Sequence, residues 1–99
     1  MEEQSIGVQL IAQERQKQID KYGFTAQYSV EHPEYYENKQ LQQAALILTG
    51  LDYAESPVTP DNWDPDRFTK LCNENRKERL IIAGALIAAE LDRLSELEN

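Results

Sequence analysis

The sequence predicts an all-α fold, a compact helical bundle of three to four helices with a long central C-terminal helix. Glycine and proline lie in clusters that divide the 99-residue chain into three segments. Within these segments apolar residues recur at helical intervals. The last segment is apolar on two faces, which is typical of a helix at the centre of a domain or in an oligomer. The length predicts a single helical domain, residues 1–99.

The first segment is predicted as a helix from about Glu2 to Lys21, ended by Gly23, which suits the left-handed conformation after a helix. One face is apolar and contains Ile6, Leu10 and Ile11. Three polar residues in its middle lie on adjoining faces: Glu14, Arg15 and Gln18. They are interpreted either as a solvated surface or as part of a shared polar site.

The stretch from Gly23 to about Glu37 is predicted as a loop that is long for a connector. It holds four aromatic residues, namely Phe24, Tyr28, Tyr35 and Tyr36. Four aromatic side chains predict that the loop packs against the domain. It also holds the only histidine, His32, which is interpreted either as a structural residue or as a ligand contact.

The second segment is predicted as a helix from about Asn38 to Asp52. Its apolar positions follow i, i+3, i+4, i+7 and i+10: Leu41, Ala44, Ala45, Leu48 and Leu51. A proline-rich connector follows, in which Asp64 and Pro65 predict a helix start with a capping side chain and proline at the first helical position. Trp63 is expected either to cover the core or to stack on a ligand.

The third segment is predicted as helical from Pro65 to about Leu97, with a break near Asn73. One apolar stripe has heptad spacing: Leu80, Gly84, Ile87, Leu91 and Leu94. A second stripe contains Ile82, Leu86 and Ala89. Because two other helices cannot cover both stripes, the sequence predicts a homo-oligomer.

Glu90 directly follows an apolar run without charge, Leu80 to Ala89. Its face also carries Arg76 and Arg79 further back in the segment. A buried carboxylate at this place needs a basic partner. Glu90 is therefore interpreted either as part of a structural ion pair or, with these arginines, as part of a ligand site.

The composition excludes several classes of function. A net charge of −8 and a pI near 4.5 argue against a nucleic-acid binder. No apolar run approaches the roughly 20 residues of a membrane helix, which predicts no membrane partner. The first residues are polar and acidic, unlike a signal or transit peptide. The single Cys72 excludes an intrachain disulfide framework and predicts a cytoplasmic setting.

Several motifs together resemble a family of small phage and prophage proteins, mostly of uncharacterised function. They are Ala12–Ile19 (AQERQKQI), Lys21–Thr25 (KYGFT), His32, Leu41–Ala45 (LQQAA), Pro60–Trp63 (PDNW), Arg79–Leu80 and Ala83–Leu94 (AGALIAAELDRL). The chain departs from the family pattern in having no loop aspartates and no second tryptophan after Trp63. The resemblance implies a compact helical accessory protein of the host bacterial cytoplasm. Such proteins often counteract host defences, and some bind nucleotide immune signals without cleaving them.

The favoured hypothesis is a protein that binds and sequesters a nucleotide-like ligand without catalysis, cofactor or metal. Such a ligand needs guanidinium groups for phosphate, aromatic rings for the base and polar groups for the ribose. The candidate ligand-binding residues are Glu14, Arg15, Gln18, His32, Trp63, Arg76, Arg79 and Glu90. We expect them to converge, in an oligomer whose subunits together build each pocket. Replacement of Arg15 or Trp63 by alanine is then expected to abolish binding without unfolding the chain.

Two alternatives remain open. A MazG-like all-α nucleotide pyrophosphohydrolase would hold magnesium with paired acidic motifs. Here Glu31 and Glu34 have the first spacing but lie before the second helix, and Glu90 and Asp92 point to different faces. The other alternative is a protein-interaction inhibitor of a host enzyme, since an acidic helical surface suits a basic host site.

Overall fold

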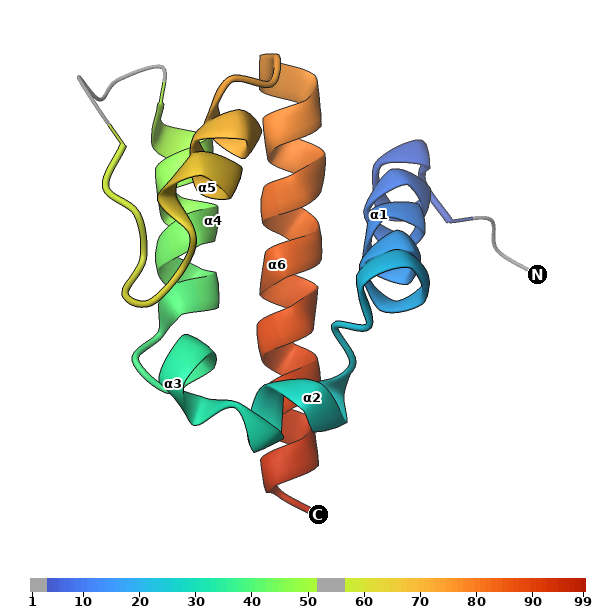
Figure 1. Cartoon of the computed structure of the whole chain (residues 1–99). Helices are drawn as coiled ribbons and strands as arrows, with labels where there is room; N and C mark the ends of the chain where they lie inside the picture. Colours follow the sequence, from blue (N-terminus) through green and yellow to red (C-terminus); the bar gives the residue numbers. More distant parts are fainter. Residues whose placement is uncertain (1–3, 52–56) are drawn as a thin grey trace.

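The longest helix, α6, lies between α4 and α1, which pack on different faces of it (Figure 1). The computed structural model describes residues 4–51 and 57–99. In chain order its helices are α1 (Ile6–Tyr22), α2 (Ala26–Glu31), α3 (Pro33–Tyr36), α4 (Gln40–Gly50), α5 (Pro65–Cys72) and α6 (Arg76–Leu97). The predicted all-α fold with a long C-terminal helix is thereby confirmed. No helix in the described part of the chain, α6 included, is long and apolar enough to cross a membrane.

α1 begins and ends at identifiable capping residues. The Ser5 hydroxyl accepts a hydrogen bond from the Val8 amide at 3.1 Å, so the helix begins at Ile6. The helix begins later than predicted, since Gln4 and Ser5 precede it; the predicted start at Glu2 itself lies outside the described residues. Gly23 ends the helix with φ 72°, as the sequence predicts, because glycine adopts this left-handed conformation without steric cost.

The stretch that was predicted as a loop contains two short helices, α2 and α3. Thr25 caps α2 through a hydrogen bond from the Tyr28 amide, and Pro33 is the first residue of α3. Helices of this length are not stable alone and depend on tertiary packing. That packing is present, since α2 lies against α6 and Tyr36 is buried in the core.

α4 begins two residues later than predicted, at Gln40. Lys39 has φ 63°, which turns the chain into the helix. The fully buried Gln40 side chain holds this turn: its Oε1 accepts from the Asn38 amide at 2.8 Å, and its Nε2 donates to the Glu34 carbonyl at 3.1 Å. The predicted end at Asp52 lies outside the described residues.

The predicted break near Asn73 separates α5 from α6. Asp64 caps α5 by accepting from the Asp66 amide at 3.0 Å, with Pro65 as the first helical residue. Asn75 caps α6 by accepting from the Glu78 amide at 2.9 Å. The Asp64–Pro65 start and the break that the sequence predicts are both confirmed.

The core lies mainly between α4 and α6. Its buried apolar residues are Tyr36, Leu41, Ala44, Ala45, Leu48, Phe68, Ile82, Ala83, Leu86 and Ala89. Alanines on both helices let the two backbones approach closely. The predicted stripe of Ile82, Leu86 and Ala89 is thus buried, whereas the heptad stripe is not part of this core.

α1 approaches α6 at Gly84. A methyl group placed on Gly84 would lie 2.5 Å from Cδ1 and 2.8 Å from Cγ1 of Ile11. Such distances are far below van der Waals contact, so any side chain at this position displaces Ile11 or the helix that carries it. Glycine at position 84 therefore sets the distance between α1 and α6.

We predict that Gly84→Leu lowers the free energy of unfolding by about 1–3 kcal/mol, because overpacking forces α1 away from α6. Combining it with Ile11→Ala should recover part of the loss, since the smaller side chain makes room. Chemical denaturation of the four proteins in this cycle measures both effects.

Gly7→Ala is the matched control, because a methyl group there meets only Ser5 Oγ, at 3.9 Å. It should leave stability unchanged or raise it by about 0.5 kcal/mol through helix propensity. Equal stability of Gly84→Leu and the parent protein would show that α1 is not held at this distance.

Candidate functional site

Arg15 joins α1 to two other parts of the chain. Its Nε donates to Asp92 Oδ2 on α6 at 2.8 Å, and its Nη1 donates to the Phe24 carbonyl at 2.8 Å. The buried Gln18 accepts a longer bond from Nη1 at 3.4 Å. The Arg15 side chain is 9% exposed and that of Asp92 44%. Arg15 is thus held in place by these contacts and has little surface for a ligand.

Glu14, on the same helix, lies near another carboxylate. Burial raises its pKa above the ordinary value; Lys17 lowers it, and Glu78 on α6 raises it further. The Lys17 ammonium is 4.0 Å from Glu14 Oε1. Glu14 therefore belongs to a partly buried charged contact between α1 and α6.

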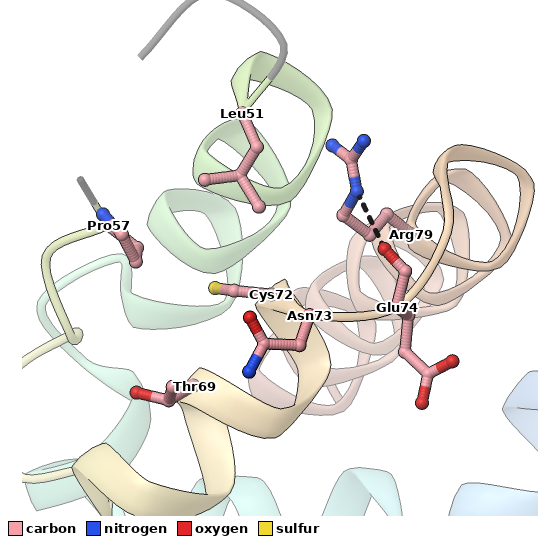
Figure 2. Close-up of a pocket in the computed structure, with 7 residues that line it drawn as sticks. All are labelled: Leu51, Pro57, Thr69, Cys72, Asn73, Glu74 and Arg79. Carbon is pink, nitrogen blue, oxygen red and sulfur yellow. Dashed lines mark hydrogen bonds between the residues drawn. The ribbon is translucent and has the colours of Figure 1, made fainter. Parts of the chain in front are cut away.

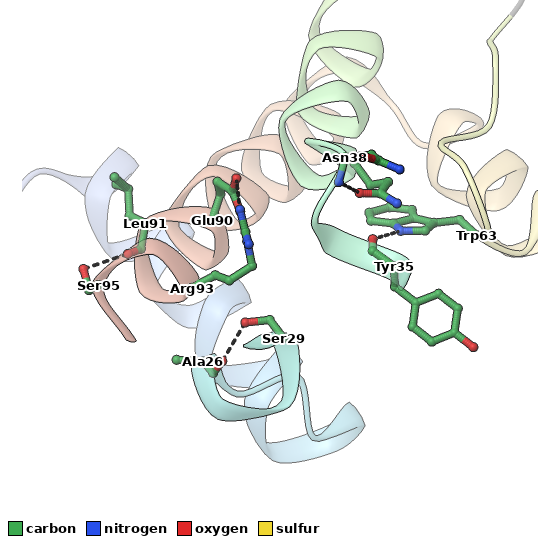
Figure 3. Close-up of polar contacts among 10 residues, drawn as sticks. Ala26, Ser29, Tyr35, Asn38, Trp63, Glu90, Leu91, Arg93 and Ser95 are labelled. Atoms are coloured by element: carbon green, nitrogen blue, oxygen red, sulfur yellow. Dashed lines mark hydrogen bonds and ion pairs between the residues drawn. The ribbon is translucent and has the colours of Figure 1, made fainter. Parts of the chain in front are cut away.

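Glu90 forms an ion pair with Arg93 one turn later on α6 (Figure 3). Arg93 Nε donates to Glu90 Oε1 at 2.7 Å, and Nη2 donates to Oε2 at 3.0 Å. Both side chains are almost buried. The hydrogen bonds to Glu90 raise the pKa of Arg93, so the guanidinium stays charged. Because Asp92 instead pairs with Arg15, the carboxylates of residues 90 and 92 point to different faces, as the sequence predicts.

Arg79 lies near the beginning of α6, beside a groove (Figure 2). Its Nη1 donates to the Leu48 carbonyl at 2.9 Å, and its Nε donates to the Glu74 carbonyl at 3.1 Å. The groove has a volume of about 450 Å³ and is lined by Leu51, Pro57, Thr69, Cys72, Asn73, Glu74 and Arg79. Burial raises the pKa of the Cys72 thiol, although Arg79 lowers it. The thiol is therefore protonated at neutral pH.

Trp63 packs on the core. Its indole Nε1 donates to the Tyr35 carbonyl at 2.8 Å, as Figure 3 shows. Its ring meets the ring of the buried Phe68 edge to face, with centroids 6.2 Å apart. In the structure Trp63 thus packs against the core, which is the first of its two interpretations.

A chain of aromatic rings, here called the aromatic belt, runs from the end of α1 through α3. It consists of Tyr22, Phe24, Tyr28, His32, Tyr35 and Tyr36. Tyr22 and Phe24 are stacked with centroids 5.7 Å apart. The His32 ring lies 4.1 Å from the Tyr28 ring, and its Nδ1 lies 3.8 Å from Glu34.

Two cations flank the exposed end of the aromatic belt. Lys21 Nζ lies 5.4 Å from the centroid of the Tyr22 ring, and the Arg67 guanidinium of α5 lies 5.7 Å from it. Both distances are within the range of a cation–π contact. The positive charges of Arg15 and Arg67 both lower the pKa of the Tyr36 hydroxyl, which burial raises. The belt therefore joins stacked aromatic surface to positive charge in an acidic protein.

The eight predicted site residues do not form one cluster. Arg15 and Gln18 are together, His32 is in the aromatic belt, and Trp63 is against Phe68. Arg79 and Glu90 are eleven residues apart on one helix, about 16 Å along its axis. Arg76 is exposed at the first position of α6. We therefore take the aromatic belt with its cations as the candidate site.

The site residues predicted from the sequence include neither Tyr22 nor Arg67. A signal for part of the belt is present, because Phe24, Tyr28, His32 and Tyr36 recur every fourth residue. No such signal exists for Arg67, which only the fold brings to Tyr22. Within residues 4–51 and 57–99, no three His, Cys, Asp or Glu side chains gather as metal ligands would.

We predict that Arg15→Ala destabilises the protein by about 1–3 kcal/mol, because Asp92 and the Phe24 carbonyl lose their donor. The sequence-based expectation was that the variant stays folded and melts within a few degrees of the parent protein. A double-mutant cycle with Asp92→Ala, followed by thermal and chemical denaturation, measures the interaction between the two side chains. We expect an interaction free energy of about 1 kcal/mol, since Asp92 is partly exposed. Full additivity would contradict a stabilising Arg15–Asp92 contact.

A second prediction concerns alkaline pH. Burial raises the pKa of Tyr36 to about 12, with smaller increases from Tyr28 and Tyr35 and decreases from Arg15 and Arg67. Because the folded pKa exceeds the ordinary value of 10, protonated Tyr36 contributes stability below pH 10 that is lost as the pH rises to 12. Relative to Tyr36→Phe, the wild-type free energy of unfolding should fall over this range. A constant difference would contradict the prediction.

Comparison with protein-family models, curated proteins and solved structures gives no significant match. The resemblance of the sequence to small phage and prophage proteins therefore stays a prediction.

Proposed function

We propose that the protein binds a small, planar, anionic ligand of the nucleotide class on the aromatic belt and holds it without chemical change. The single observation that carries this proposal is the environment of Tyr22. Tyr22 is 43% exposed although its ring is stacked on that of Phe24, and the Arg67 guanidinium lies over the ring. Stacked rings suit a nucleobase, and a guanidinium donates paired hydrogen bonds to phosphate.

Charge supports a local recognition of this kind. The chain carries a net charge of −8, which repels anions at long range. Lys21 and Arg67 both lie at Tyr22, so attraction is confined to the end of the belt. Arg15 is bound to Asp92, which leaves Arg67 and Lys21 as the cations that can reorient toward a phosphate.

The protonation state of Tyr36 makes its hydroxyl unsuited to attack a bound ligand. The Tyr36 hydroxyl has a pKa of about 12 and is neutral at pH 7. An attacking or proton-accepting group at neutral pH needs a lower pKa than this. Tyr36 is therefore suited to packing and hydrogen bonding within the belt.

We predict that Arg67→Gln weakens nucleotide binding about tenfold or more, the usual value of a charge-assisted hydrogen bond. Tyr22→Leu should weaken it similarly by removing the stacking ring. Isothermal calorimetry against linear and cyclic nucleotides, with and without Mg²⁺, measures both. A thermal-shift assay selects the nucleotide first, and circular dichroism confirms that each variant is folded.

Lys70→Gln is the matched control, because it removes the same charge from an exposed position on the same helix. Lys70 lies in the last turn of α5, whereas Arg67 lies over the Tyr22 ring. It should change affinity less than Arg67→Gln does. Equal effects of the two variants would show that net charge alone matters and would contradict the proposed site. Nucleotide turnover with Mg²⁺ would instead favour the pyrophosphohydrolase, and no response to any nucleotide would favour the host-enzyme inhibitor.

A further inference from the structure

The predicted heptad stripe of α6 is largely exposed in the structure, except at Gly84, where α1 approaches. Its four large residues, Leu80, Ile87, Leu91 and Leu94, are 41%, 51%, 60% and 42% exposed. The stripe adjoins an apolar groove of about 210 Å³ between α1 and α6, lined by Gly7, Leu10, Ile11, Lys77, Leu80 and Ile81. Contiguous apolar surface of this kind on a small soluble domain marks an interaction site.

The spacing of the stripe suits a second helix. From Lys77 to Glu98 its positions are separated alternately by three and four residues: Lys77, Leu80, Gly84, Ile87, Leu91, Leu94 and Glu98. This repeat keeps one seam facing a partner helix over several turns. The other stripe of α6 is already buried against α4, so the partner must come from outside this chain's described helices.

The charges at the ends of α6 are complementary to those of a second copy of the chain in antiparallel orientation. The seam begins at a cation, Lys77 after Arg76, and ends at an anion, Glu98 after Glu96. In an antiparallel pair of identical helices each basic end lies beside an acidic end. The two helix dipoles are then antiparallel, which is electrostatically favourable. In a parallel pair like charges would meet at both ends.

Three exposed residues of the stripe are evenly spaced, since Ile87 lies seven residues from both Leu80 and Leu94. Antiparallel pairing therefore places Leu80 of one copy opposite Leu94 of the other, with the two Ile87 side chains at the centre. A two-fold interface requires self-complementarity of this form. We propose that two copies of the chain form a homodimer through antiparallel contact of their α6 stripes around Ile87.

Light scattering and analytical ultracentrifugation of the full chain test the proposal. At about 50 µM protein we expect twice the chain mass of 11.4 kDa. Ile87→Glu and Leu91→Glu should each return the mass of one chain, because a carboxylate is then placed in the seam. Both positions are exposed, so circular dichroism should show an unchanged helical fold.

Leu46→Glu is the control, since Leu46 is 71% exposed on α4, away from the seam. It should remain dimeric. A wild-type mass of 11.4 kDa, a mass other than that of two chains, or a dimer that survives both seam variants would overturn the proposal.

Charge reversal tests the antiparallel orientation. Lys77→Glu and Glu98→Lys should each weaken the dimer, and the double variant should restore it, because the two residues pair between copies. In a parallel dimer the single variants would still place like charges together, and the double variant would give no specific recovery. Absence of recovery would therefore overturn the antiparallel arrangement.

Discussion

The packing of α4 and α1 depends on how closely each can approach α6. α4 packs against it through small residues on both sides, Ala44 and Ala45 opposite Ala83 and Ala89. α1 approaches at Gly84, where even a methyl group would overlap Ile11. Because α6 carries small residues where these two helices come closest, a chain of only 99 residues can pack helices around it and still bury a continuous core.

The polar contacts reinforce this arrangement at the lower half of α6. Arg15 connects α1 to Asp92 and to the Phe24 carbonyl beyond Gly23, so one guanidinium fixes both the helix and the turn after it. Glu90 and Arg93 satisfy one another where α2 covers α6. An enclosed ion pair such as Glu90–Arg93 adds little net stability, but removing one partner leaves an unpaired charge. These polar contacts specify where the helices lie more than they strengthen the fold.

The main helices were predictable because their signals are local. Gly23 and Asp64–Pro65 mark helix ends through backbone preferences that need no tertiary contact. The short helices α2 and α3 were not predictable, since their stability comes from packing on α6 and on the core. For the same reason, the aromatic residues of this stretch predicted its packing against the domain better than its length predicted its conformation.

The candidate site was predictable only in part, for a geometric reason. Polar residues on one helix lie on different faces and at different positions along its axis. Sequence spacing alone does not say which neighbouring residue each will contact. Arg79 bonds to the end of α4, whereas Glu90 bonds to Arg93 three turns further along. Arg67 of α5 lies over the Tyr22 ring only in the folded chain. Such a contact joins residues far apart in the chain, and no local pattern records it.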